Sequence, residues 1–229
     1  MPEGGDVVYT LDFSTVFKSF DVLLGGALLT IELSAAAMVL GLIVAVSGAL
    51  GKLFGPSWLK RVVDVYIEVI RNTPFLIQIF LVYFGLPQAG LRLEPVPAAL
   101  LAMVVNVGAY AIEIVRAGID AIPRGQINAG FALGLGRLQV FRYVILRPAL
   151  RKVFPALTSQ FIWLMLGSSV VSTISADDLT QVASNLASNN FKHFEVYIVV
   201  TVMYLIMTLL FSGAFALIRR WAFSYPESR

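Results

Sequence analysis

The chain has 229 residues, of which 58% are hydrophobic and only 14% are charged, and it contains no cysteine. Its mean hydropathy is +0.82, and a soluble domain of this length cannot bury so much apolar surface, so the composition predicts an integral membrane protein. The lack of cysteine excludes disulfides, thiolate metal sites and cysteine nucleophiles. The single histidine, His193, leaves little material for a histidine-rich metal site or a Ser-His-Asp triad.

Five apolar segments are long enough to cross about 30 Å of hydrocarbon as helices. They are residues 23–50, 62–86, 96–115, 153–174 and 196–218. Each is continuously apolar rather than alternating, which favours helices over a barrel. The predicted fold is an all-α integral membrane protein with five transmembrane helices in one domain, residues 23–218, between an external segment 1–22 and a tail 219–229. Segment 1–22 has no basic stretch or cleavage signature, so we expect the first span to be an uncleaved anchor.

Lysine and arginine are unevenly distributed among the loops, although the net charge is only +3. The loop after the first span, the loop at residues 117–152 and the tail are basic, whereas the other loops and the amino-terminal segment are not. Because cytoplasmic loops carry the excess of lysine and arginine, we predict an external amino terminus, a cytoplasmic carboxyl terminus and a cytoplasmic loop at 117–152.

The second span contains a polar cluster, Glu68, Arg71 and Asn72, several residues inside its predicted boundary. A charge deep in a span costs about 2.5–3.5 kcal/mol on the lenient scale, and Glu68 and Arg71 are three residues apart, so they could neutralise each other. Pro74 has no amide hydrogen and frees the carbonyl of Ile70. Transporters use such broken helices to bind solutes, so the cluster is either a structural ion pair or part of a substrate site.

Polar side chains also occur in the third and fourth spans. Asn106 is near the middle of the third span and is a candidate to line a pathway, while Glu113 and Arg116 are expected to form an ion pair at its end. The fourth span is the least apolar, and we expect it to be central, with Ser168 and Ser169 facing the pathway. The apolar fifth span is expected to be peripheral.

The loop at residues 117–152 is too long for a simple turn and too apolar to be unstructured. Pro123 suits the first position of a helix over residues 126–133, which Gly134 ends, and a second helix is predicted over residues 138–145. Gly130 and Gly134, four residues apart, predict a stripe without side chains that another surface could approach closely. From these features alone the loop is either an amphipathic hairpin on anionic lipid or a docking surface for a protein.

At this loop the sequence resembles a known family. The segment GIDAIPRGQINAGFALGLGRLQVFRYVILRPALR is similar to the "EAA" loop of ATP-binding cassette (ABC) importer permeases. Three further segments resemble the polar amino-acid branch of that family, which handles histidine, glutamate, glutamine, arginine, lysine and opines: RNTPFLIQIFLVYFGLP, GAYAIEIVRAGI and IWLMLGSSVVSTIS. The resemblance extends in order from the first span to the last.

The resemblance implies that the loop forms a short coupling helix that seats in a cleft of an ATPase subunit. The residues of this sequence that match the coupling motif are Gly125, Asn128, Ala129, Gly130, Ala132, Leu133 and Gly134. Asn128 is a departure, because the family usually has a glutamate there. Asparagine can form hydrogen bonds but no full ion pair, so we expect the contact to depend mainly on shape and on the surrounding arginines.

The function implied by the resemblance is that of a transmembrane subunit in the inner membrane of a bacterium, forming the translocation pathway for a polar amino acid. The expected partners are two ABC ATPase subunits, a second permease subunit (identical or homologous) and an extracytoplasmic solute-binding protein. ATP and Mg would be held by the ATPases, with no cofactor, metal or nucleic acid on this chain. The chain has no G-x-x-x-x-G-K-[ST] loop, so it cannot hydrolyse ATP by that route.

Two other function classes remain open. A secondary transporter driven by an ion gradient would usually contain an internal repeat, and none is evident in these five spans. An intramembrane enzyme would need a catalytic group such as paired aspartates, but Asp177 and Asp178 lie just outside the fourth span.

Overall fold

The computed structural model describes residues 10–136 and 139–222, and in this part of the chain every regular element is helical. The amino-terminal half contains α1 (Ser14–Lys18), α2 (Phe20–Phe54), α3 (Ser57–Arg71), α4 (Phe75–Phe80), η1 (Leu81–Gly85), η2 (Leu86–Ala89) and α5 (Pro95–Asp120). The remainder contains α6 (Arg124–Ala132), η3 (Val140–Leu146), α8 (Arg147–Gly167), η4 (Ser168–Ile174), α9 (Leu179–Asn190) and α10 (His193–Ala222).

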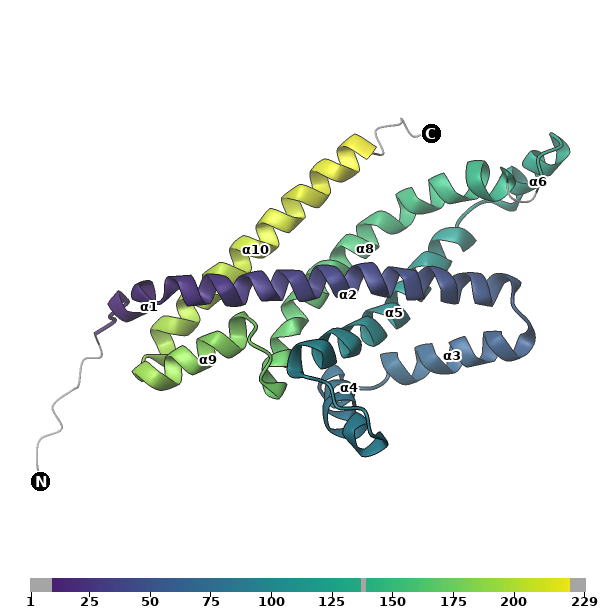
Figure 1. Cartoon of the computed structure of the whole chain (residues 1–229). Helices are drawn as coiled ribbons and strands as arrows, with labels where there is room; N and C mark the ends of the chain where they lie inside the picture. Colours follow the sequence, from purple (N-terminus) through teal and green to yellow (C-terminus); the bar gives the residue numbers. More distant parts are fainter. Residues whose placement is uncertain (1–9, 137–138, 223–229) are drawn as a thin grey trace, which may run out of the picture.

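The long helices run between two ends of an elongated bundle (Figure 1). One end carries α1 and α9 and is called the α9 end; the other carries α6 and the last turns of α10 and is called the α6 end. Among the described residues, four helical stretches are long and apolar enough to cross a membrane: Phe20–Phe54, Pro95–Asp120, Pro148–Ile174 and His193–Ala222. The predicted all-α membrane fold is confirmed.

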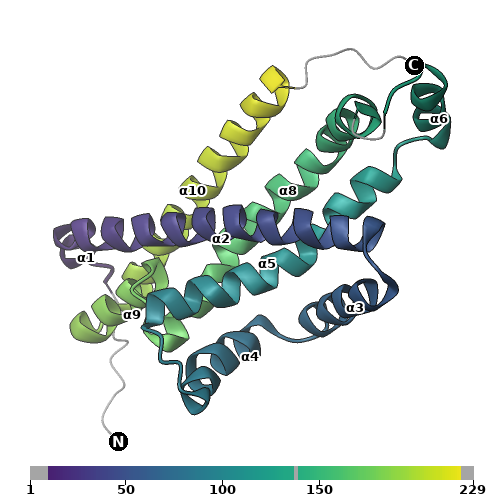
Figure 2. The same cartoon turned by 45° about the vertical axis from the view of Figure 1, so that its right-hand side comes forward.

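The predicted second span is not one straight helix. It consists of α3 and the segment Phe75–Ala89, which are bent by 108° relative to each other, and it brings the number of candidate spans to five if the pair is counted as one. Figure 2 shows α3 lying beside α2 and α4 turning away from it. The break lies at Pro74, which cannot donate to the helical hydrogen-bond ladder.

Helices α2 and α5 form the centre of the bundle and approach each other through small residues. A Cβ atom on Gly41 would collide with Val107, and one on Gly48 would collide with Ile112. Small residues let two helix backbones come close where the membrane gives no hydrophobic driving force for association. Helix α2 has 35 residues and is therefore about 52 Å long, so it extends beyond the hydrocarbon layer or crosses it at a tilt.

The segment between the third and fourth spans is shorter than predicted. Helix α5 continues to Asp120, and η3 runs directly into α8 at Arg147, so residues 121–146 remain between the spanning helices. The second helix predicted in the loop is not separate from the fourth span, because η3 continues into α8. Pro148 lies in the first turn of α8, where proline is tolerated. Residue 138, the predicted start of the second loop helix, lies outside the described residues.

The fourth span is less central than predicted, since 28% of its most apolar window is buried, against 39% for α2 and 50% for α5. The fourth ends in a 3-10 turn, η4, rather than in regular α-helix. The fifth, α10, is peripheral as expected, since only 17% of its most apolar window is buried.

The amino-terminal segment is attached to the turn between α9 and α10. The ammonium group of Lys192 donates to the Asp12 carboxylate and, at 3.2 Å, to the Thr15 hydroxyl. The backbone N–H of Asp12 donates to Glu195 at 3.2 Å. The hydrogen bond from Lys192 holds the pKa of Asp12 well below its usual range. These contacts fix α1 against the α9 end.

Helix α9 begins at a buried aspartate, Asp178, next to the point where it contacts α2. Asp178 is fully buried, and its Oδ1 atom accepts from the Gln181 N–H at 2.9 Å, which caps the helix. Its Oδ2 atom has no hydrogen-bond partner among the described residues. The neighbouring Leu179 N–H donates to the Thr30 hydroxyl of α2 at 3.0 Å. Burial raises the pKa of Asp178 to about 6.

This raised pKa predicts that Asp178→Asn removes a pH-dependent loss of stability. The native protein holds the proton more tightly than the unfolded chain. The aspartate therefore costs nothing at pH values below its ordinary pKa of 3.8, little at pH 4, and its full penalty, about 2–3 kcal/mol, above pH 6. Asparagine can still cap α9. Thermal unfolding in detergent should show the variant and wild type nearly equal at pH 4 and the variant clearly more stable at pH 7.5. Asp177→Asn, at the exposed neighbour, is the matched control. The Asp177 charge makes only the smallest contribution to the raised pKa of Asp178, so this variant should follow the wild-type stability closely at both pH values. A gain in stability of Asp178→Asn that does not vary with pH would contradict the assignment.

Candidate functional site

The break in the second span is held by one buried glutamine. Pro74 leaves the Ile70 carbonyl without a helical donor, and the Gln78 amide donates to that carbonyl at 2.8 Å. The same amide donates to the Thr73 carbonyl at 3.1 Å and to its hydroxyl at 2.8 Å. The Gln78 Oε1 atom accepts from the Asn106 amide of α5 at 2.8 Å. Gln78, which is only 7% exposed, thus joins α3, α4 and α5. Sequence reasoning missed this residue, although an amide side chain four residues after a proline in an apolar run is a signal that could have found it.

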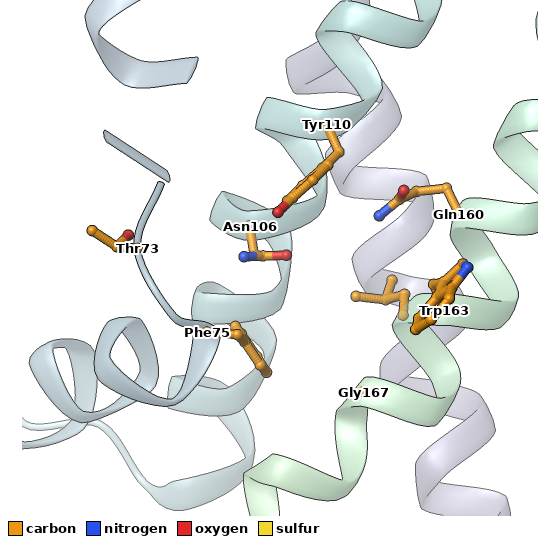
Figure 3. Close-up of a pocket in the computed structure, with 8 residues that line it drawn as sticks. Thr73, Phe75, Asn106, Tyr110, Gln160, Trp163 and Gly167 are labelled. Carbon is orange, nitrogen blue, oxygen red and sulfur yellow. The ribbon is translucent and has the colours of Figure 1, made fainter. Parts of the chain in front are cut away.

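A cavity of about 400 Å³ adjoins this break (Figure 3). The α5 side chains Asn106 and Tyr110 face Gln160 and Trp163 of α8 across it, with Thr73 and Phe75 contributed by the break. Leu164 and Gly167 complete the lining. The predicted lining role of Asn106 is therefore supported by its place at this cavity.

A second cavity, of about 580 Å³, lies nearer the α6 end of α5 and α8. Tyr110 and Gln160 line both cavities, so the two adjoin along these helices. The second cavity adds three charged residues, Arg71, Glu113 and Lys152. We call these two adjoining cavities between α5 and α8 the polar channel, after the amide and hydroxyl groups that line one of them and the charges that line the other.

Glu113 is the centre of the charged part. Its carboxylate lies 3.7 Å from each of the cationic groups of Lys52, Arg71 and Arg116. The predicted Glu113–Arg116 pair is thus present, but Arg71 pairs with Glu113 and not with Glu68, and its guanidinium lies 5.5 Å from the centroid of the Tyr110 ring. All three distances exceed the 2.7–2.9 Å of a tight charge-assisted hydrogen bond, so the contacts of Glu113 with these cations are loose. Lys52 and Arg116 also have other partners, Asp64 at 2.5 Å and Asp120 at 3.4 Å.

The other predicted pathway residues have different positions. Glu68 and Asn72 are exposed on α3, where the Asn72 amide donates to the Glu68 carbonyl at 2.8 Å, and neither lines the two cavities. Ser168 is fully buried and donates to the Met165 carbonyl at 2.7 Å. The expectation that it faces a pathway does not hold, because the 3-10 turn directs it into the core. Ser169 is half-buried and donates to its own helix.

Helix α6 lies at the tip of its end of the bundle, beside η3. It ends as predicted, with Gly134 in the left-handed region at φ +78°. Two apolar side chains near its end are left uncovered, Phe131 at 46% and Leu133 at 82% exposure. Of the other residues that match the coupling motif, Gly125, Asn128, Ala129 and Ala132 are exposed as well.

The predicted two-glycine stripe is wrong. Gly130 faces its own chain, since a Cβ atom there would lie 3.2 Å from Val140 and 3.3 Å from Val144 of η3. Gly134 lies beyond the helix, in the turn that follows it. Gly130 therefore serves the packing of α6 on η3, and the surface that α6 presents outward is the one around Leu133.

The described residues contain no group of three or more histidine, aspartate or glutamate side chains arranged to hold a metal ion. The site thus consists of a polar channel and an exposed short helix.

Comparisons with known proteins identify the family of the chain. Residues 37–223 match the family model described as "Binding-protein-dependent transport system inner membrane component". The chain is 36% identical to the glutamine transport system permease protein GlnP of Escherichia coli over 88% of this chain and 93% of that protein. It is 33% identical to the octopine transport system permease protein OccM of Rhizobium meliloti, over 93% and 90% of the two chains.

Solved structures agree with this. A crystal structure described as an amino acid ABC transporter with histidines has a chain that is 37% identical, with a TM-score of 0.87 over 93% of this chain and 99% of that one. The methionine ABC transporter MetNI, at 22% identity, shares the fold with a TM-score of 0.76.

The family match covers most of the chain, and the curated relatives are matched over nearly their whole length. In such a transporter the permease is not itself catalytic, ATP is hydrolysed by partner ATPases, and a binding protein supplies the solute. The chain therefore belongs to the family of binding-protein-dependent transport system inner membrane components and is a multi-pass permease subunit of an ABC transporter.

Proposed function

We propose that this chain imports a polar amino acid and that the channel between α5 and α8 is its pathway. The observation that carries the proposal is the 36% identity to a glutamine permease over 88% of the chain. Relatives named for octopine and L-cystine transport, at 33% and 35% identity, also handle amino acids or their derivatives. Amino-acid substrates differ in their side chains, so contacts with the substrate side chain determine which one is selected. Every amino acid also carries an ammonium and a carboxylate group, and these need the same partners in the transporter in every case.

Two charged groups of the channel suit those partners. The Arg71 guanidinium meets the substrate carboxylate, and the Glu113 carboxylate meets the ammonium group. The Arg71 guanidinium and the Glu113 carboxylate are 3.7 Å apart, which is longer than a tight ion pair. A zwitterionic substrate can therefore insert between them and replace their ion pair with two, one to each of its charged groups. Tyr110, Gln160 and Asn106 supply hydrogen-bonding groups along the way.

The α6 end faces the cytoplasm in this proposal, and the α9 end faces the solute-binding protein. The support is the distribution of basic residues: Lys52, Lys60 and Arg61 lie around the turn from α2 to α3, and Arg219 and Arg220 end α10. This orientation places the exposed end of α6 where one of the two ATPase subunits can bind it. Leu133 and Phe131 are its contact residues, and Asn128 adds a hydrogen-bonding group.

A second permease subunit covers α3. The helix leaves an apolar stripe exposed, formed by Trp58, Val62, Val65 and Val69. It also leaves the carboxylate of Glu68 exposed, which is costly against lipid. Both features are accommodated if α3 faces a second permease, identical or homologous, with Glu68 and Asn72 toward the shared pathway.

The coupling of ATP hydrolysis to transport follows the chain from α6 to α8. Helix α6 packs on η3 at Gly130, and η3 continues without a break into α8, which carries Gln160 and Trp163 into the channel. When the ATPases close on ATP, they move α6 and with it the η3–α8 helix. The channel then opens alternately to the two sides of the membrane.

Variants of the two charges test the substrate assignment. Arg71→Ala and Glu113→Gln should each raise the KM for uptake about tenfold to a hundredfold, because each removes a charged hydrogen-bond partner worth roughly 1.5–3 kcal/mol. The measurement is uptake of radiolabelled glutamine, arginine and cystine by proteoliposomes holding the whole transporter. Glu94→Gln, at an exposed glutamate in the loop before α5 and outside both cavities, is the matched comparison and should leave the KM nearly unchanged. An unchanged KM in both Arg71→Ala and Glu113→Gln would refute the assignment.

A further inference from the structure

An apolar groove of about 240 Å³ lies near the α6 end of the bundle, apart from the polar channel. Its walls come from α2, α5, η3 and α8, and every residue that lines it is apolar. They are Leu42, Val46, Ala49, Leu50, Val115, Ile119, Phe141, Ile145, Leu146, Ala149, Leu150, Val153 and Leu157. A cavity of this composition does not hold water, because it offers no hydrogen-bond partners.

The groove is open on the outside of the chain. Its outer lining residues are substantially exposed: Val46 by 48%, Leu50 by 37%, Leu146 by 37% and Leu150 by 46%. Three of its walls, α2, α5 and α8, are candidate membrane spans. Hydrocarbon chains of the bilayer are therefore the material that meets this opening.

An arginine stands beside the groove. Arg142 is exposed and precedes the lining residues Ile145 and Leu146 by three and four positions, less than one turn of η3. Its guanidinium lies 5.8 Å from the centroid of the Tyr143 ring, whose side chain is 64% exposed. No carboxylate of the described residues lies within ion-pair distance of Arg142, so its charge is available to an external anion.

We infer that this groove binds one acyl chain of an anionic phospholipid, whose phosphate is held by Arg142 with the Tyr143 hydroxyl beside it. The acyl chain alone gains little, because lipid tails are as apolar as the groove. The headgroup contact must therefore select the lipid. Guanidinium groups suit phosphate oxygens, and basic pockets between spanning helices are known to hold anionic headgroups.

Lipid titration tests the inference directly. The chain, purified in detergent with the subunits that accompany it, is titrated with dioleoyl phosphatidylglycerol or dioleoyl phosphatidylcholine, and bound lipid is counted by native mass spectrometry. Wild type should prefer phosphatidylglycerol about fivefold, the contribution of one basic side chain near an anionic headgroup. Arg142→Gln should bind both lipids equally. Arg220→Gln, at an exposed arginine of α10, is the matched control and should keep the preference.

A second pair of variants tests the groove itself. Val46→Trp fills the groove from its open side and should reduce binding of both lipids, whereas Val39→Trp, at a 60% exposed position of α2 outside the groove, should not. Equal binding of the two lipids by wild type, or a preference that persists in Arg142→Gln, would overturn the inference. So would loss of the second permease subunit from the Val46→Trp assembly, since the groove would then be a protein contact. These readouts do not depend on transport, so they stand whether or not the substrate assignment is correct.

Discussion

Gln78→Leu should destabilise the permease by about 2–6 kcal/mol and abolish most uptake. The leucine fits the volume of the buried site but leaves the Ile70 carbonyl and the Asn106 amide without the partners that Gln78 provides. Each buried polar group left unpaired costs about 1–3 kcal/mol. The break at Pro74 then loses its connection to α5, and the cavity beside it loses its shape. Chemical unfolding in detergent and uptake in proteoliposomes measure the two effects.

Two further variants make this prediction specific. Gln88→Leu changes an exposed glutamine of η2 in the same bent segment and should alter stability by less than about 0.5 kcal/mol. Adding Asn106→Leu to Gln78→Leu also removes the amide that Gln78→Leu leaves unpaired. The double variant should therefore lose less stability than the sum of the losses of the two single variants. If Gln78→Leu unfolds like wild type and transports normally, Gln78 does not hold the break.

Leu133→Asp should weaken the association with the ATPase subunits roughly 30-fold, the effect of losing an interface residue worth about 2 kcal/mol. Leu133 is 82% exposed and contributes little to the fold of its own chain, so the purified permease should remain as stable as wild type. Copurification of tagged permease with the ATPases measures the association, and ATPase activity stimulated by binding protein measures its consequence.

Two variants of the same kind serve as controls. Leu91→Asp, at a 62% exposed leucine in the loop before α5, should leave the ATPases bound. Asn128→Glu should also be tolerated, because Asn128 is exposed and the contact is made mainly by shape. A strong loss of transport in Asn128→Glu, with Leu133→Asp unaffected, would mean that the contact is centred on Asn128 and not on Leu133.

The spans and the break were predictable because local features determine them. Apolar runs fix where a chain can cross hydrocarbon, and Pro74 marks a helix break wherever it occurs in such a run. Gly134 ended its helix as expected, since few other residues adopt its positive φ. Asn106 was predicted to line a pathway from its position near the middle of an apolar span, and it lines the cavity beside the break.

The partners of the polar groups were not predictable, because they come from distant parts of the chain. Arg71 is three residues from Glu68, yet it pairs with Glu113 of another helix. Gly130 looked like a bare outer surface, but η3 covers it after the chain reverses at Gly134. Gln78 was not among the predicted site residues, because only the bend brings it against Ile70 and α5. Such pairings depend on how helices pack, and no single segment encodes them.

The most direct test of the account is uptake by proteoliposomes that contain the permease with its ATPases, the solute-binding protein outside and ATP inside. We expect accumulation of a radiolabelled polar amino acid that requires ATP, both partner proteins and an intact Leu133, with no uptake by the permease alone under an imposed proton or sodium gradient. Uptake by the permease alone in response to such a gradient, without ATP, would contradict the account and identify the chain as a secondary transporter.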